Sequence, residues 1–339
     1  MPEELPPLLI TGAGGAAAVA VVNEVWPLCS ELHAADMDPC AAGLYLVPEQ
    51  NRHLIPSASD PTFVDRLLNL CVLYGIEVLV PTVDAELVPI ARRRADFEHI
   101  GVQVMVASSE VLETVLDKAR LMEAVASEVP CPRTVVYDRG VDLSSWRWPA
   151  LLKPRRGSGS RGVRVLGRPS ELLNLPADGS ALLQEYLPGD EYSVDVLATP
   201  SGEPLVAVPR VRLKVDSGIA VCAATVRDPE LEELSKRVVG RLRLPFVCNV
   251  QWKRDVHGDP RLLEINPRFP GTMPLTVASG VNMPRLALAL LLGSKVRVPE
   301  QFAPKAVVRT WKETWVPYTE LAIMLERGAR STQTAEVAG

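Results

Sequence analysis

Apolar runs of strand length alternate with helical stretches through the first third of the chain. They follow one another in this order: Leu8–Thr11, Ala16–Val25, a run that ends near Asp36, Phe63–Tyr74, and 77–81. Strands that alternate with helices form βαβ units, whose strands lie parallel in one sheet. We therefore expect a Rossmann-like α/β domain over residues 1–112.

The pattern changes after a predicted helix at 110–126. Between residues 134 and 195, glycines and prolines separate short apolar runs, which is typical of a small antiparallel sheet. Two further helices are expected, at Pro229–Leu242 and 284–292. The predicted organisation is thus α/β followed by α+β: a second domain at 113–293 with a small lobe at about 125–186, then a C-terminal appendage at 294–339 whose polar end, from 331, should fray.

Composition narrows the class of protein. Of 339 residues, 47% are hydrophobic but only 5% aromatic, so we expect a large aliphatic core. A net charge of −5 argues against nucleic acid as the main partner. The six cysteines form no CxxC pair or zinc spacing, so reduced, buried thiols in a cytoplasmic protein are expected. The N-terminus lacks signal-peptide features, and the longest apolar run, 286–292, is too short to span a membrane.

Two strand-like runs between residues 246 and 268 flank a turn-rich loop. If they pair as a hairpin, Gln251 lies opposite Glu264 and Asn249 opposite Asn266, and all four side chains share one face. A carboxylate and amide oxygens on rigid strands suit Mg²⁺, a hard ion that takes oxygen ligands. An amphipathic hairpin with a solvated face is the alternative, although asparagine is depleted in strands. The opposite face should carry the apolar residues Cys248, Val250, Trp252, Leu263 and Ile265.

A glycine- and serine-rich loop follows the strand that ends near Lys153. After Pro154-Arg155-Arg156 come four small residues: Gly157, Ser158, Gly159 and Ser160. Glycines let backbone N–H groups turn toward an anion, and basic side chains supply counter-charge, so this loop is a candidate for polyphosphate binding. It is not a Walker A loop, because GxxxxGK[ST] does not occur. A surface hairpin without a ligand is the alternative.

Two further runs bracket a Pro-Gly turn at 188–189. The backbone from Glu185 to Leu187 could bind an adenine edge, and the carboxylate of Glu191 could accept hydrogen bonds from ribose hydroxyls. Glu191, Ser193 and Asp195 share one face by strand alternation. An ordinary half-exposed hairpin is the alternative.

The N-terminal turn Gly12-Ala13-Gly14-Gly15 satisfies a loose dinucleotide-binding pattern, and Asp36 lies about where a ribose-binding acid would. An NAD(P)-linked enzyme is therefore a rival hypothesis. The same turn could instead direct helix N–H groups at a substrate carboxylate. Thr82, Asp84 and Glu86 follow a strand end at the same sheet edge, where they could assist the ligand or cap a helix.

Together these segments resemble the ATP-grasp superfamily, most closely the ATP-binding half of the carbamoyl phosphate synthase large chain and its stand-alone relatives. The resemblance covers roughly residues 5–293. Five motifs in order are specific where one alone would be weak. The motifs are Asp117-Lys118, Lys153-Pro154 with its loop, the segment 185–195, Asn249-Val250-Gln251, and Glu264-Ile265-Asn266-Pro267-Arg268.

The resemblance implies an ATP-grasp fold, in which a parallel pre-ATP-grasp domain precedes an antiparallel lid lobe and an α+β C-terminal lobe that hold ATP between them. It also implies a role for each matched residue. The segment that contains Arg210 and Lys214 corresponds to a loop near the phosphates, with solvated strand charges as the alternative. The implied roles are phosphate or purine contacts for Lys118 and Lys153, adenine binding by Glu185, Tyr186 and Leu187, ribose binding by Glu191, Mg²⁺ ligation (Mn²⁺ as a possible substitute) by Gln251, Glu264 and Asn266, and support of the phosphoryl group by Arg268.

The implied reaction has two steps. A substrate carboxylate attacks the γ-phosphate of ATP, and an amine then displaces phosphate from the acyl phosphate to give an amide. This chemistry needs positioning and charge neutralisation rather than a protein nucleophile, which agrees with the lack of a Ser-His-Asp or Cys-His pattern. With one ATP-grasp unit and no glutaminase region, a complete carbamoyl phosphate synthase is not expected.

We therefore expect an ATP-dependent ligase for small, amino-acid-like acids and amines, without a nucleic-acid or membrane partner. A homodimer is the default assembly. Activation of bicarbonate or another carboxylate, an NAD(P)-binding oxidoreductase and a non-catalytic ATP-binding protein are the alternatives.

Overall fold

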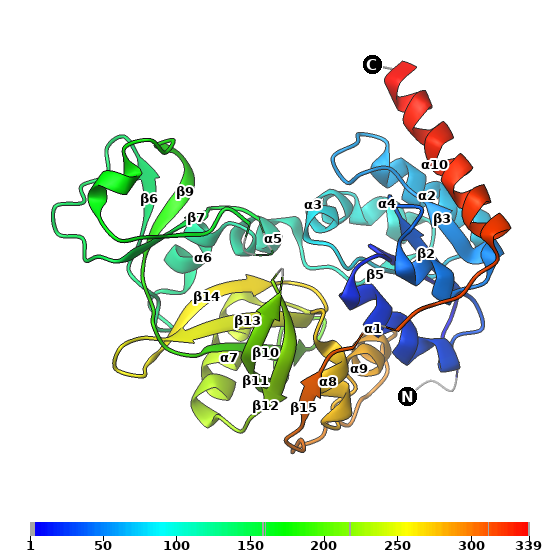
Figure 1. Ribbon diagram of the computed structural model, residues 1–339. Helices are drawn as coiled ribbons and strands as arrows, with labels where there is room; N and C mark the ends of the chain where they lie inside the picture. Colours follow the sequence, from blue (N-terminus) through cyan, green and yellow to red (C-terminus); the bar gives the residue numbers. More distant parts are fainter. Residues whose placement is uncertain (1–3, 158, 160, 217, 311, 338–339) are drawn as a thin grey trace.

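A computed structural model describes residues 4–157, 159, 161–216, 218–310 and 312–337. Ser158 and Ser160, both expected in the phosphate-binding loop, lie outside the described residues. Figure 1 shows the parallel sheet on one side of the molecule and the two antiparallel sheets on the other. The predicted succession of α/β and α+β organisation is confirmed.

The N-terminal sheet is parallel and has the strand order β3-β2-β1-β4-β5. Leu8 of β1 pairs with Leu32 on one side and Val78 on the other, and all three side chains are buried. Strands buried on both faces need helices on both sides, which the intervening segments supply. The elements are β1 (Leu8–Thr11), α1 (Ala16–Val25), η1 (Trp26–Leu28), β2 (Leu32–Asp36), η2 (Ala42–Leu46), η3 (Glu49–Asn51), β3 (Arg52–Leu54), α2 (Phe63–Tyr74), β4 (Val78–Val80), α3 (Asp84–Arg92), α4 (Arg94–His99) and β5 (Gln103–Val104).

Two short helices lead out of this domain, α5 (Ser109–Val115) and α6 (Lys118–Val125). The sequence had predicted one helix over 110–126, and this was wrong. Asp117 is extended (φ −107°, ψ 104°), and its side chain accepts hydrogen bonds from the amides of Ala119 and Arg120. An aspartate that caps the next helix competes with continuation of the preceding one.

The small lobe is a four-stranded antiparallel sheet in the order β6-β9-β7-β8, with an aliphatic and aromatic core of its own around Trp146 and Leu183. The glycine-rich loop joins β7 to β8, and therefore lies at one end of this sheet. The elements are β6 (Thr134–Asp138), β7 (Ala150–Pro154), β8 (Arg164–Leu166), η4 (Pro169–Leu172) and β9 (Asp178–Glu185).

The large antiparallel sheet has the order β14-β13-β10-β11-β12-β15. Helix α7 packs on one face, where its side chains share a core with Val194, Val250 and Trp252. The other face, which carries Ser193 and Asn249, borders the candidate site. The elements are β10 (Glu191–Ala198), β11 (Pro204–Asp216), β12 (Ile219–Thr225), α7 (Pro229–Leu242), β13 (Phe246–Arg254), β14 (Pro260–Asn266), α8 (Met273–Ala278), α9 (Met283–Leu291) and β15 (Ala306–Val308).

The C-terminal segment, expected as an appendage, contacts both the large sheet and the N-terminal domain. Strand β15 pairs with β12 at the edge of the large sheet. Helix α10 (Tyr318–Val337) then returns to the N-terminal domain, where Arg52 and Glu320 form an ion pair at 2.7 Å (Figure 1). Residues 331–337 of the end expected to fray are helical, and residues 338–339 lie outside the described residues.

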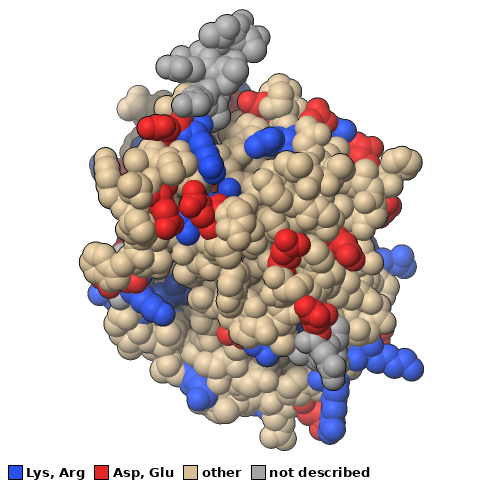
Figure 2. Space-filling view, turned by 90° about the vertical axis from the view of Figure 1, so that its right-hand side faces the viewer, with Lys and Arg blue, Asp and Glu red and all other residues tan. Residues whose placement is uncertain are grey.

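Charges of both signs are scattered over the face shown in Figure 2. None of the described helices is long and apolar enough to cross a membrane. All six cysteines are unpaired, as expected, but only Cys71 and Cys248 are buried, and Cys40 is exposed.

Candidate active site

The hairpin of β13 and β14 has the predicted register. Asn249 pairs with Asn266 and Gln251 with Glu264. A β-bulge follows, because Trp252 pairs with Leu262 rather than with Leu263. Leu262, not Leu263, is therefore the core residue, and the prediction for Leu263 was wrong: it lines a cavity on the site face. The extra residue of a bulge cannot be read from strand alternation.

A cavity of about 290 Å³ lies between the small lobe and this hairpin, and we call it the lobe cavity. Leu151 and Val165 of the small lobe provide apolar lining, whereas Gln251 and Glu264 of the hairpin provide polar groups. An apolar wall with a few converging polar groups is typical of small-molecule sites. The residues expected to bind nucleotide that line the lobe cavity are Lys118, Lys153, Gly157, Glu185, Tyr186, Leu187, Glu191 and Gln251.

Two lysines converge on Glu264 in the lobe cavity. Lys118 Nζ lies 3.2 Å from Glu264 Oε2 and donates to the carbonyl of Gly157 at 2.7 Å. Lys153 Nζ donates to the carbonyl of Leu263 at 3.3 Å. The side chain of Lys153 is buried, which lowers its pKa to about 8; the charge of Glu264 raises that pKa and the charge of Lys118 lowers it further. A buried ammonium next to a second lysine favours the binding of an anionic ligand.

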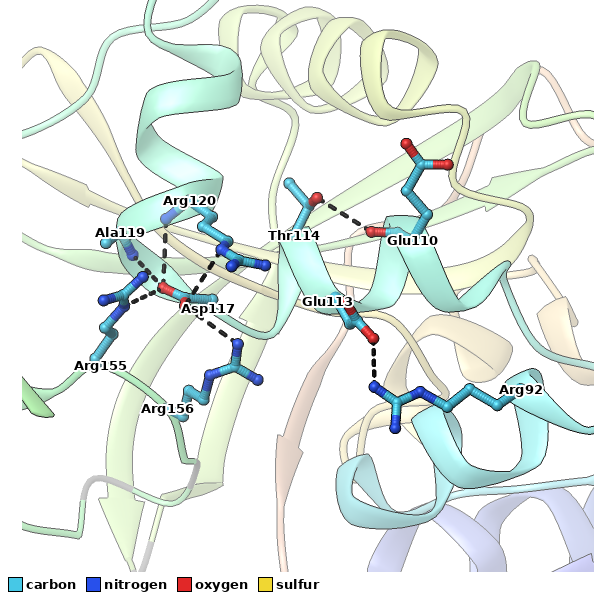
Figure 3. A network of polar contacts seen from close by, with 9 residues as sticks. All are labelled: Arg92, Glu110, Glu113, Thr114, Asp117, Ala119, Arg120, Arg155 and Arg156. Carbon is cyan, nitrogen blue, oxygen red and sulfur yellow. Dashed lines mark hydrogen bonds and ion pairs between the residues drawn. The ribbon is translucent and has the colours of Figure 1, made fainter.

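Asp117 fixes the start of the glycine-rich loop next to Lys118 (Figure 3). Its carboxylate is buried, accepts from Arg155 Nε at 2.7 Å and pairs with Arg156 at 3.3 Å. The amide of Lys118 donates to the carbonyl of Arg155 at 3.1 Å. Burial acts to raise the pKa of Asp117, but the hydrogen bonds from Arg155 and the α6 backbone outweigh it, so the pKa is lowered. One carboxylate thus caps α6 and holds the loop against it.

Glu185, Tyr186 and Leu187 form the rim where β9 leaves the small lobe. Glu185 is tied to the preceding segment, since its amide donates to the carbonyl of Arg133 and its carboxylate accepts from the amide of Arg133. Glu191 lies across the cavity in an ion pair with Arg212, which also donates to Gln251 Oε1 at 3.3 Å. Arg212 belongs to the basic segment that was expected near the phosphates, and it shares strand parity with Arg210.

A second cavity of about 190 Å³ adjoins the first at Gln251 and Glu264, which line both. We call it the arginine cavity, because Arg210, Arg212 and Arg268 line it. Its other walls come from the hairpin, from β10, from the start of β12 and from the loop before α8. Gly159 of the glycine-rich loop, expected to bind the nucleotide phosphates, also lines this cavity and not the lobe cavity. The Gln251–Glu264 pair therefore stands at the junction of two compartments.

Lys214, expected beside Arg210, does not reach either cavity. It is exposed, and the pairing of β11 with β12 shifts register between Arg212 and Lys214. Simple alternation would have placed Arg210, Arg212 and Lys214 on one face. The irregularity interrupts that alternation, and Lys214 lines neither cavity, so its expected role near the phosphates stays a prediction.

Asp195 organises the floor of the arginine cavity. It is fully buried and forms an ion pair with Arg210. Its two oxygens also accept from Asn249 Nδ2 at 2.8 Å and from Thr276 Oγ1 at 2.6 Å. A buried carboxylate with several partners is rigid, so it fixes Asn249 and Arg210 rather than acting as a mobile ligand.

Arg268 connects the hairpin to the N-terminal domain. Its Nε and Nη2 atoms donate to the two carboxylate oxygens of Asp84, each at 2.8 Å, and Nη2 lies 3.5 Å from Asn266 Oδ1. A two-pronged pair of this kind fixes the guanidinium plane. Asp84 is the first residue of α3, and the N-cap residue Val83 makes no side-chain cap, so capping by Asp84 or Thr82 was not the right alternative.

The N-terminal glycine turn is held by a hydrogen bond to the side chain of Asp36. The amide of Gly14 donates to Asp36 Oδ2 at 2.7 Å, so the carboxylate expected to bind a ribose holds the turn instead. Nearby, Thr11 Oγ1 donates to the buried Glu86 at 2.6 Å. Burial raises the pKa of Glu86 to about 7, although the bond from Thr11 lowers it. These contacts favour a structural turn over a dinucleotide site.

The donor set at the junction fits magnesium. Glu264 supplies a carboxylate, and Gln251 and Asn266 supply amide oxygens on rigid strands. Mg²⁺ is commonly held by one or two carboxylates together with phosphate oxygens and water. Among the described residues no group of three or more His, Cys, Asp or Glu side chains could hold a metal, so a bound ion here would depend on nucleotide phosphates.

Two family models match the chain. One, described as "PylC-like, N-terminal domain", matches residues 8–105. The other, described as "ATP-grasp in the biosynthetic pathway with Ter operon", matches residues 178–314 and so spans the whole hairpin. The chain contains an ATP-grasp domain. The segment 185–195 and the motifs at 249–251 and 264–268 lie within this match, whereas Asp117-Lys118 and Lys153-Pro154 lie outside both matched ranges.

Curated relatives match a shorter part of the ATP-grasp protein. D-alanine–D-alanine ligase from Thermotoga sp. (strain RQ2) is 31% identical over 103 residues, which is 29% of this chain and 34% of that enzyme. The corresponding ligase of Thermotoga petrophila is 28% identical over the same length. The match thus spans about a third of the curated relatives.

Solved structures share the fold over most of the chain. A biotin carboxylase complex from Campylobacter jejuni has a TM-score of 0.71 at 14% identity and covers 88% of this chain and 74% of that one. N5-carboxyaminoimidazole ribonucleotide synthetase from Thermus thermophilus has a TM-score of 0.69 at 19% identity, and covers 88% of this chain and 82% of that one. The fold class predicted from the sequence is confirmed.

Proposed function

We propose that this ATP-grasp protein is an ATP-dependent carboxylate–amine ligase that forms an amide through an acyl phosphate. The observation that carries the proposal is the Gln251–Glu264 pair at the junction of two cavities. One cavity has the lysines and apolar walls that suit a nucleotide, and the other has the arginines that suit an acid. Phosphoryl transfer requires this kind of alignment and charge neutralisation.

In this proposal the lobe cavity binds ATP. Lys118 and Lys153 would neutralise phosphate charge, and main-chain groups from Glu185 to Leu187 would contact adenine at the rim. Glu191 would accept hydrogen bonds from the ribose hydroxyls, and these would replace part of its ion pair with Arg212. The loop at 155–162 would lie over the phosphates, because Asp117 already fixes its first residues beside Lys118.

Gln251, Glu264 and Asn266 would hold magnesium, which would neutralise the β- and γ-phosphates when bound. Lys118 pairs with Glu264 in the described structure and would turn to phosphate as the ion takes that carboxylate. Arg268, held by Asp84, would stabilise charge on the transferred phosphoryl group and on the acid. The substrate carboxylate would then lie in the arginine cavity, beside the γ-phosphate.

Replacement of Glu264 by glutamine tests the proposal. Glu264→Gln removes the single carboxylate of the donor set and should abolish Mg²⁺-dependent ADP release from a panel of amino acids, dipeptides and bicarbonate. Mn²⁺ should support the wild-type activity. Glu233→Gln, on the exposed side of α7, is the matched control and should be normal. Near-normal turnover of Glu264→Gln would refute the metal assignment.

The rival dinucleotide hypothesis has a direct test. Mg-ATP should raise the melting temperature of the protein, and NADPH should not. Stabilisation by NADPH alone would reverse this conclusion and return attention to the Gly12–Gly15 turn. Bicarbonate is included in the acid panel because a solved structure that shares this fold, a 2-oxoglutarate carboxylase domain, is described in complex with that anion.

A further inference from the structure

Two arginines contact the wall of the arginine cavity, and of the two only Arg210 has a carboxylate partner among the described residues. Arg210 forms its ion pair with Asp195. Arg309 follows β15 and donates through Nη2 to the carbonyl of Gly271, a residue that lines the cavity. Burial lowers the pKa of Arg309, and the like charge of Arg210 lowers it further. Two neighbouring guanidinium groups with one carboxylate partner leave one positive charge without a counter-charge.

Arg210 has unused donor capacity inside this cavity. Its side chain is 2% exposed, yet Nε has no hydrogen-bond partner among the described residues. The Nε atom of Arg309 is likewise buried and without a partner in that part of the chain. Guanidinium donors that are removed from bulk water without an acceptor are costly, and native structures rarely leave them so unless an ordered water, an ion or a ligand supplies the acceptor.

The other cations of the site are already matched. Arg212 pairs with Glu191, Arg268 with Asp84, and Lys118 with Glu264. Lys153, which donates to a carbonyl, lines the lobe cavity and would meet the nucleotide phosphates. The excess positive charge at Arg210 and Arg309 is therefore on the acid side of the junction, away from the lobe cavity, which neither residue lines.

We propose that the arginine cavity binds an acid that carries a second anionic group, which Arg210 and Arg309 recognise together. This inference rests on the proposed ligase function, in which the first carboxylate is phosphorylated near Glu264. The second group would be a carboxylate or a phosphate, since both accept from guanidinium in the same geometry. The cavity, at about 190 Å³, is smaller than those for drug-sized ligands, so the acid is of amino-acid size.

The test separates the acid from the amine by trapping the acyl phosphate with hydroxylamine, which yields a hydroxamate and phosphate. Aspartate, glutamate and phosphoserine are compared with asparagine, glutamine and serine in the presence of Mg-ATP. The anionic member of at least one pair should have a kcat/KM at least tenfold higher. A preference for aspartate or glutamate would identify the second anionic group as a carboxylate, and a preference for phosphoserine would identify it as a phosphate.

Variants locate the recognition. Arg309→Ala should reduce the preference for the anionic member to about twofold or less, and Arg309→Lys should retain part of it. Arg297→Ala, an exposed arginine in the same C-terminal segment, is the matched control and should keep the full preference. Calorimetry with Mg-ATP analogue present should show the same order of binding, independent of turnover.

The outcomes are separable from those of the ligase test. If asparagine, glutamine or serine serves as well as its anionic partner while ADP release still requires Glu264, the second-anion inference is wrong and the ligase proposal stands. If Mg-ATP stabilises the protein but no anionic acid binds, the inference again fails alone. If Mg-ATP neither binds nor is hydrolysed with any acid, both fall.

Discussion

Lys153 should make ATP use fall as the pH rises above 8. Its ammonium is buried beside the carbonyl of Leu263, and burial lowers its pKa to about 8. If only the charged lysine binds polyphosphate, a change from pH 7 to pH 9 reduces the competent fraction about tenfold, which corresponds to about 1.4 kcal/mol of binding free energy. kcat/KM for ATP should therefore be nearly flat below pH 7.5 and fall about tenfold per unit above pH 8.

The stability of the free protein should change in the opposite direction. The pKa of Lys153 is lower in the folded state than in the unfolded chain, so above pH 8 the folded protein loses this proton first. The unfolded state then binds more protons, and the free energy of unfolding rises with pH until about 10.5. The difference between the two pKa values corresponds to on the order of 3 kcal/mol.

Initial rates at varied ATP, measured between pH 6.5 and 9.5, test the first effect, and urea unfolding without nucleotide tests the second. Lys153→Met should weaken ATP binding at neutral pH and abolish both pH dependences. Lys295→Met, an exposed lysine outside both cavities, should retain them. A flat ATP profile across pH 7–9, or an identical slope in Lys153→Met, would refute the reasoning.

Three further results are expected. Asp117→Ala should lower the free energy of unfolding by about 2 kcal/mol, because it removes the α6 cap and the buried partner of Arg155, and it should raise KM for ATP. Because the folded pKa of Asp117 is depressed, this stabilisation is present above about pH 4 and is lost as pH falls further. Asp84→Asn should lower kcat/KM for the acid about tenfold with little change in KM for ATP, since it frees the guanidinium plane of Arg268. The pKa of Glu86 is raised to about 7 in the folded state, so its contribution to the free energy of unfolding falls as pH rises from 4.5 through 7. The stability of Glu86→Gln relative to wild type should therefore increase over that interval.

Each of these results has its own contradicting outcome. An Asp117→Ala protein as stable as wild type at pH 7 would show that the Arg155 contact and the cap contribute nothing measurable. For Asp84→Asn, loss of ATP binding rather than of acid use would place Arg268 with the nucleotide. For Glu86→Gln, a stability difference that stays constant between pH 5 and 8 would mean that Glu86 is charged throughout.

The sequence determined the local arrangement of the site. Strand alternation and one turn were enough to predict that Asn249 faces Asn266 and Gln251 faces Glu264, because both residues of each pair belong to one hairpin. The βαβ succession likewise predicted the parallel sheet. Strand alternation fails where a ladder is irregular: a bulge removed Leu263 from the core, and another irregularity interrupts the alternation between Arg212 and Lys214.

Only the tertiary structure decided which distant residues meet. Asp84 and Arg268 are 184 positions apart in sequence, and their pairing depends on how the two regions pack. Arg309 lies beyond the motifs, and it joins Arg210 only because β15 pairs with β12. The periodicity of apolar side chains predicts which face of an element is buried, but not which other elements pack against that face. The motifs therefore predicted the proposed nucleotide side, whereas the charge of the proposed acid side follows from packing.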